Sequence, residues 1–135
     1  MAYWLAKTEP STYSWQRLVK EKHARWDGVR NPQARNNLAA MKKDDEVLIY
    51  HSGDDKAVIG IASVTKTAYP DPTADDEKWL CVDLVPVRAL PAPVTLATIK
   101  AQKSLADCVL VKNSRLSVQP VSAAEFRAIL ALSKK

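Results

Sequence analysis

The sequence predicts a mixed α/β (α+β) fold with a mostly antiparallel β-sheet that curls towards a small barrel. Strand-like apolar runs and short helical patterns follow one another without the regular βαβ alternation of a parallel sheet. The chain of 135 residues is long enough to bury a core without disulfides, and no repeat, low-complexity tract or linker divides it. We therefore expect a single domain over residues 1–135.

The N-terminal part of the chain predicts a strand followed by a short helix. Residues 2–8 mix aromatic and aliphatic side chains and stop at Glu9-Pro10, which favours a strand. Ser14 is a suitable N-cap for the helix that follows, because its hydroxyl can accept a hydrogen bond from a backbone N–H in the first turn. The face of this helix expected to be buried carries Trp15, Leu18 and Val19.

A second helix and three strands are expected in the middle of the chain. Asn31 followed by Pro32 predicts the helix start, because Asn caps well and Pro fits the first helical position. Its buried face is expected to carry Ala34, Leu38 and Met41. The strands, of which the first is expected to be central, span residues 46–52, 57–67 and 79–90. The acids of residues 70–78 are irregularly spaced, which favours a solvated loop over a cation site.

The C-terminal third predicts short helices around one extended segment. Residues 94–102 and 104–111 are expected to be helical, whereas residues 115–121 are expected to be extended because of their proline. Ser122 and Glu125 have the spacing of a capping box, in which each side chain bonds the backbone N–H of the other. The amphipathic C-terminal helix that follows would bury Phe126, Ile129 and Leu130.

The charges are segregated along the chain. The net charge is +5, but residues 17–43 carry +6, residues 44–83 carry −7 and residues 84–135 carry +6. Segregation of this kind favours a partner with a negative face, and nucleic acid is the common candidate. The alternative is that basic and acidic segments lie side by side and neutralise each other.

Signals of catalysis, metal binding and membrane insertion are weak or absent. Cys81 and Cys108 lie in apolar surroundings, as expected of buried thiols in a reducing compartment. The spacing of histidines and cysteines does not fit a zinc site, and no phosphate-binding glycine loop exists. We therefore expect no cofactor, no metal and no enzyme. Without a signal peptide or membrane span, we expect a cytoplasmic monomer, or a nuclear one in a eukaryote.

Three segments instead combine hydrogen-bonding side chains with aromatic or apolar ones, as a binding site does. They are residues 26–37, 50–53 and 114–120. Arginine provides a planar fork for phosphate or a base edge, Asn and Gln both donate and accept, and Trp or Tyr provides a stacking face.

A structural explanation exists for each of these residues. Asn31 would then only cap its helix, and Tyr50 and His51 would only close the core. Arg30 or Arg35 would pair with Asp27. The other tryptophans, expected in the core, are Trp4, Trp15 and Trp79.

Six blocks that span almost the whole chain resemble the EVE domain, a family of the PUA-like superfamily. The blocks are YWLAKTEPSTYSW (3–15), WDGVRNPQARNNLAAMK (26–42), LIYHSG (48–53), VIGIASV (58–64), AYPDPTA (68–74) and SRLSVQPVS (114–122). The resemblance implies a PUA-like curled barrel flanked by helices, and binding of RNA or DNA with recognition of a modified base, methylated cytosine derivatives being favoured. One departure is visible, since Asp44 stands where the family usually has glycine.

The resemblance also implies which residues form the base pocket. The positions are Trp26, Arg30, Asn31, Arg35, Asn36, Tyr50, His51, Ser52, Arg115, Ser117 and Gln119. We expect one extruded base to enter a pocket at the barrel mouth, with all three polar segments around one hollow. Residues expected to hold phosphates are Lys20, Lys22, Arg25, Lys42 and Lys43.

Two other functions compete with this hypothesis. One is a small-molecule or nucleotide binder, or a hydrolytic enzyme, that uses His51 with Ser52 or Tyr50. The other makes the basic surface a protein-interaction face.

Overall fold

A computed structural model describes residues 1–134 and confirms the α+β class. Its strands are β1 (Tyr3–Thr8), β2 (Ala24–Trp26), β3 (Glu46–His51), β4 (Ala57–Pro70), β5 (Leu80–Thr95) and β6 (Val118–Val121). Its helices are α1 (Trp15–Glu21), α2 (Pro32–Ala40), α3 (Leu96–Ala101), α4 (Val109–Lys112) and α5 (Ala123–Ser133), with a 3₁₀ turn η1 (Lys103–Leu105). Every helix within residues 1–134 is too short or too polar to span a lipid bilayer.

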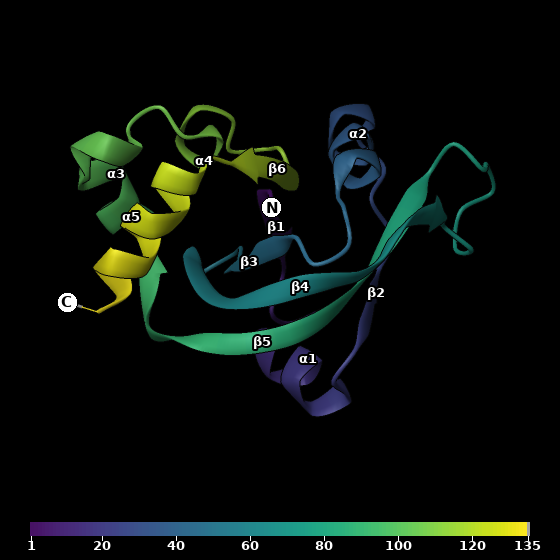
Figure 1. Ribbon diagram of the computed structural model, residues 1–135, viewed down its shortest axis with the longest axis horizontal. Helices are drawn as coiled ribbons and strands as arrows, with labels where there is room; N and C mark the ends of the chain where they lie inside the picture. Colours follow the sequence, from purple (N-terminus) through teal and green to yellow (C-terminus); the bar gives the residue numbers. More distant parts are fainter. Residues whose placement is uncertain (135) are drawn as a thin grey trace.

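The strands form one six-stranded sheet in the order β2-β5-β4-β3-β1-β6. All neighbouring pairs are antiparallel except β1 and β3. Strand β3 lies between β4 and β1, near the centre as expected. The long strands β4 and β5 carry several register shifts, which increase local twist and bend the sheet. Figure 1 shows the resulting curl, with α1 at the bottom of the view, α2 at the top and α3 to α5 gathered at one end.

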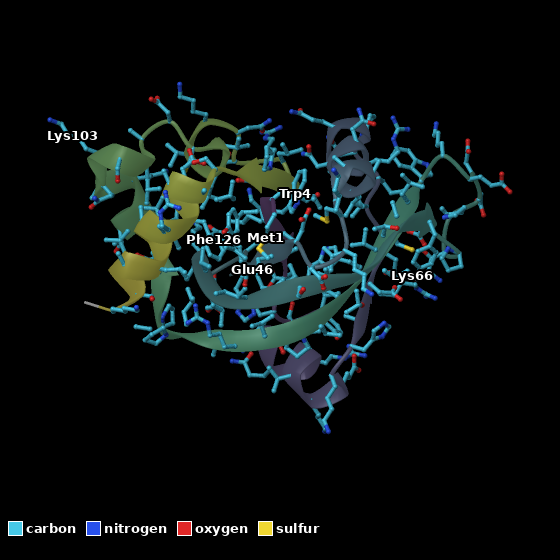
Figure 2. All side chains as sticks on the ribbon, in the orientation of Figure 1. Met1, Trp4, Glu46, Lys66, Lys103 and Phe126 are labelled. Atoms are coloured by element: carbon cyan, nitrogen blue, oxygen red, sulfur yellow. The ribbon has the colours of Figure 1, made fainter. Side chains whose placement is uncertain are left out.

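The two faces of the sheet pack against different helices. One core cluster combines the indoles of Trp4, Trp15 and Trp26 with Leu38 of α2. The other combines Leu5 and Tyr50 with α3, α4 and α5, where Tyr3 stacks on Phe126 at 4.2 Å. Figure 2 shows Trp4 on the side of α2, and Phe126 on α5 itself.

Gly60 allows the close approach of α1 to the sheet. A Cβ atom at this position would lie 2.7 Å from the Trp15 indole, well inside contact distance. Because the missing side chain lets the indole lie directly on β4, glycine here brings α1 close against the sheet.

The helix caps agree with the sequence in detail. The Asn31 side chain accepts a hydrogen bond from Ala34 N–H at 2.9 Å, and Pro32 opens α2. Ser122 and Glu125 form the expected capping box of α5. Asp44 adopts φ +74°, the conformation that the family's glycine at this position suggested.

Several expectations were wrong in position or burial. Val19 is 46% exposed, because it lies on the outer side of α1. Trp79 is only half-buried and contacts the cations of Arg35 and Lys78. Strand β5 continues to Thr95, so the expected helix at residue 94 begins two residues later. The added part of the strand crosses Pro91 and Pro93 and is still paired with β4 at its end, where Val94 lies opposite Val58.

Candidate functional site

A cavity of about 650 Å³ opens between the end of β1, helix α1 and the loop from β2 to α2. We call it the main cavity. Its lining comes from residues 7–8, 12–13, 25–32 and from Arg17 and Ser117. Ligand cavities of proteins are typically ~300–1,000 Å³ and combine apolar walls with a few placed polar groups. The main cavity therefore has the size and composition of a small-ligand site.

Its apolar wall is an aromatic corner. The rings of Tyr13 and Trp26 meet edge to face, with centroids 6.1 Å apart and planes at 90°. Trp26 is 9% exposed and Tyr13 is half-buried, so the pair is held rigidly while part of it faces the cavity. Burial and the hydrogen bond to Glu21 raise the pKa of Tyr13 to about 12, so its hydroxyl keeps its proton.

The opposite rim is the loop of residues 27–31, which is anchored by Asp71. Gly28 turns with φ +77° and donates its N–H to Oδ2 of Asp71 at 2.8 Å. Arg30 reaches the same oxygen at 2.9 Å through Nη1. Its Nη2 donates to the Thr73 hydroxyl at 3.2 Å. Arg30 therefore pairs with Asp71, whereas the partner of Asp27 is Arg25 at 2.8 Å.

Asp71 is ionised and buried in spite of lying in an acidic loop. Burial by itself would raise the pKa of its carboxyl. The hydrogen bonds from Thr73, Gly28 and Arg30 outweigh that effect and hold the pKa far below the ordinary range. The expectation of a fully solvated loop over residues 70–78 was thus wrong for Asp71, which is only 3% exposed.

Four cationic side chains line the main cavity, and they differ in how they are compensated. Arg17 pairs with Glu21, Arg25 with Asp27 and Arg30 with Asp71. Lys7 instead donates to the backbone carbonyl of Ser114 at 2.5 Å, a neutral acceptor. Burial lowers the pKa of Lys7 from its usual value.

The three polar segments were expected to surround one cavity, but the structure has two cavities there. Of the expected base-pocket residues, Trp26, Arg30, Asn31 and Ser117 line the main cavity. Tyr50 and Ser52 line a smaller one of about 260 Å³, the side cavity. The two cavities share Lys7.

His51 is buried in the core and is used structurally. Its Nε2 accepts a hydrogen bond from the backbone N–H of Trp15 at 2.9 Å. Its Nδ1 lies 3.1 Å from Oδ2 of Asp55. Because both ring nitrogens are engaged and the side chain is 4% exposed, the geometry does not favour a hydrolytic or nucleotide-binding role for His51.

The other expected pocket residues contact the protein itself. The guanidinium of Arg35 lies 5.6 Å from the Trp79 ring and donates to Asn36, so both residues face the β4–β5 hairpin. Gln119 is 1% exposed and donates to the Leu116 carbonyl at 2.9 Å. Arg115 is exposed, outside the linings of both cavities.

Sequence reasoning missed one whole wall of the main cavity. Lys7, Thr8, Thr12, Tyr13 and Arg17 line it, and none was among the expected pocket positions. A signal existed in Lys7, a cation inside an otherwise apolar strand. The remaining four carry no local mark, because only folding brings α1 and the turn before it against β2.

The chain matches a protein-family model, curated relatives and solved structures. The family model described as EVE domain matches residues 2–132. Thymocyte nuclear protein 1 of Mus musculus is 36% identical over 98% of this chain and 74% of its own length. The solved structure of Rpa0253 from Rhodopseudomonas palustris is 44% identical, with a TM-score of 0.94 over 99% of this chain and 94% of that chain.

A further relative was solved with nucleic acid. The crystal structure of human THYN1 protein in complex with 5-methylcytosine containing DNA is 33% identical to this chain. Its TM-score is 0.92, and the match covers 100% of this chain and 99% of that chain.

Proposed function

The chain belongs to the EVE domain family, and from this premise we propose that it binds nucleic acid and takes one modified base, of the methylated-cytosine class, into the main cavity. The observation that carries the proposal is the main cavity itself, which joins a rigid aromatic corner to a rim of hydrogen-bonding side chains. The structure of a relative, human THYN1, in complex with 5-methylcytosine containing DNA supports the ligand class.

The lining suits a flat, polar ring. The Tyr13–Trp26 corner offers an apolar surface for a base face, and such contacts contribute ~1–3 kcal/mol per base. Arg30, Asn31 and Ser117 add donors and acceptors around the rim, as reading a base edge requires. Extruding a base from a duplex costs a few kcal/mol, which these contacts together are large enough to offset.

Discrimination of the methyl group is expected to be modest. One buried methyl contributes only ~1 kcal/mol of apolar transfer free energy, so a loose cavity would distinguish 5-methylcytosine from cytosine by less than about tenfold. A rigid wall increases this ratio, because it cannot relax around the smaller base.

Filling the main cavity tests the proposal without removing any core contact. Thr12 is exposed and lines the cavity, whereas its neighbour Ser11 is exposed outside the lining. Thr12→Trp should weaken binding of a 5-methylcytosine oligonucleotide more than about tenfold, because the new ring occupies the site of the base. Titration calorimetry measures the affinity, and thermal unfolding checks the fold.

Ser11→Trp is the matched control, since it adds the same ring one residue away. It should bind like the wild type. Equal affinity of wild type, Thr12→Trp and Ser11→Trp would exclude the main cavity as the base site, and failure of the wild type to bind any oligonucleotide would overturn the proposal as a whole.

A further inference from the structure

The side cavity lies next to the main cavity and has a different character. Its volume is about 260 Å³ and its lining is mostly apolar, with Tyr50 of β3, Leu96 of α3 and Leu110 of α4 as the apolar part. Tyr50 and Leu110 are each 3% exposed, so the floor is firmly packed. A flat apolar floor of this kind suits the face of a ring rather than an extended polar group.

Lys7 and its neighbours connect the two cavities. Lys7 lines both, and its Nζ lies 5.7 Å from the centroid of the Tyr50 ring. The backbone carbonyl of the adjoining residue Thr8 accepts a hydrogen bond from the N–H of Ser52 at 2.9 Å. This bond joins β1 to Ser52, which lines the side cavity. The two cavities therefore adjoin at the Lys7 side chain, which contacts both.

The polar rim carries positive charge that the protein leaves uncompensated. Two lysines line the side cavity, Lys7 and Lys56, and within residues 1–134 neither forms an ion pair. The Glu9 carboxylate lies against Gly53 on the same rim, so charge alone does not define the site. The apolar floor has to contribute to binding as well.

From this arrangement we propose that the side cavity holds the nucleotide next to the inserted base, with its base against Tyr50, Leu96 and Leu110 and the intervening phosphate at Lys7. The proposal rests on the function proposed above, because it needs a base in the main cavity to fix the neighbour's position. It assigns the side cavity a ligand, a pyrimidine or purine nucleotide, and it explains why two lysines surround an apolar floor.

Comparing a nucleoside with dinucleotides separates the two proposals. The nucleoside 5-methyl-2′-deoxycytidine tests the main cavity alone. Dinucleotides that add thymidine on its 5′ or its 3′ side test the side cavity. We expect one of the two to bind about tenfold or more tightly than the nucleoside, because a stacked base and a phosphate are added. The gain should be confined to one side, since the side cavity adjoins the main cavity in one direction only.

An abasic neighbour distinguishes the base from the phosphate. A dinucleotide whose neighbour carries only the sugar should lose most of the gain. If the abasic dinucleotide binds as tightly as the complete one, the ring does not enter the side cavity and the proposal is overturned. Equal affinity of the nucleoside and both dinucleotides overturns it too, while leaving the main-cavity proposal intact.

A charge reversal at Lys56 tests the same site from the protein side. Lys56 is exposed and, of the two cavities, lines only the side one. Lys56→Glu should weaken the favoured dinucleotide about threefold or more and leave nucleoside binding unchanged. Lys66→Glu is the matched control, because Lys66 is exposed at the end of the molecule opposite to α3 in Figure 2. An equal loss in both variants would indicate long-range electrostatics and would contradict a contact at the side cavity.

Discussion

Asp71 shows how one residue can position a functional loop without lining the cavity that the loop forms. Its carboxylate accepts hydrogen bonds from Gly28, 43 positions earlier in the chain, and from Arg30. Both donors belong to the rim of the main cavity. The loop over residues 27–31 thus depends for its shape on a single buried anion, and Arg30 is held in place by an ion pair rather than by its own packing.

We expect Asp71→Asn to destabilise the protein by about 2 kcal/mol, because the variant keeps only one of the two acceptor oxygens and removes the charge that pairs with Arg30. It should also weaken binding of a 5-methylcytosine oligonucleotide, since the rim loses its anchor. Asp75→Asn, at an exposed acid of the same loop, is the control and should change neither quantity. Urea unfolding measures the stability of all three proteins.

The pH dependence of this difference has a defined sign. The Asp71 carboxyl has a pKa below its unfolded value of ~4, so its stabilising effect is complete above that value and is lost as the pH falls. The stability gap between wild type and Asp71→Asn should therefore be constant near neutral pH and narrow below about pH 4. A gap that stays constant down to the acid unfolding transition would show that the carboxylate charge contributes nothing.

At the scale of elements, α2 begins where the main cavity ends. Asn31 caps the helix and also lines the cavity, so its capping role is confirmed and its role in base recognition stays a prediction. Its side-chain oxygen is bonded to the helix N-terminus, which leaves recognition to the amide nitrogen. Helix α2 is in turn tied to β6 by the hydrogen bond from Asn37 to the Val118 carbonyl at 2.7 Å.

Two substitutions at Asn31 separate capping from recognition. Asn31→Ala should cost about 1 kcal/mol of stability, because the cap is lost. Asn31→Asp keeps an oxygen at the helix N-terminus, where a negative charge is favourable, so its stability should match the wild type. It removes the amide donor, however, and should weaken oligonucleotide binding. If Asn31→Asp binds the oligonucleotide as tightly as the wild type, Asn31 serves only as a helix cap.

At the scale of the whole molecule, the basic segments of the sequence supply exposed cations, some of which line the main cavity. Arg17 and Arg25 line the cavity but are paired with Glu21 and Asp27. Lys20, Lys22, Lys42 and Lys43 are exposed and stay predicted phosphate contacts. Their contribution can be measured because each phosphate contact releases counterions, and the dependence of affinity on salt concentration reports how many contacts form.

The affinity for an oligonucleotide should fall as salt rises, with a logarithmic slope of about −0.9 per phosphate contact on duplex DNA. Lys42→Ala should lower the magnitude of this slope by about one, whichever base occupies the main cavity. Arg127→Ala, at an exposed cation of α5, should leave the slope unchanged. A slope that is the same in wild type and Lys42→Ala removes Lys42 from the phosphate contacts.

What the sequence determined by itself is mainly local. The caps at Ser14, Asn31 and Ser122 were predictable because a cap joins residues only three positions apart, within reach of chain geometry alone. The mixed fold and the family could be predicted for a similar reason, because both are recognised from the order of short segments along the chain. Residues 26–31, which form one part of the lining of the main cavity, were also predictable, because they are contiguous in the sequence.

The tertiary structure alone decided which distant residues meet. The role of Asp71 depends on a contact across 43 positions, and that of His51 on the N–H of Trp15 across 36 positions. Such contacts are set by how the sheet curls and how the helices pack on it. The same packing places the three expected polar segments around two cavities instead of one. Periodicity in a sequence specifies which face of a strand is buried, whereas the partner across that face follows only from how all six strands pack.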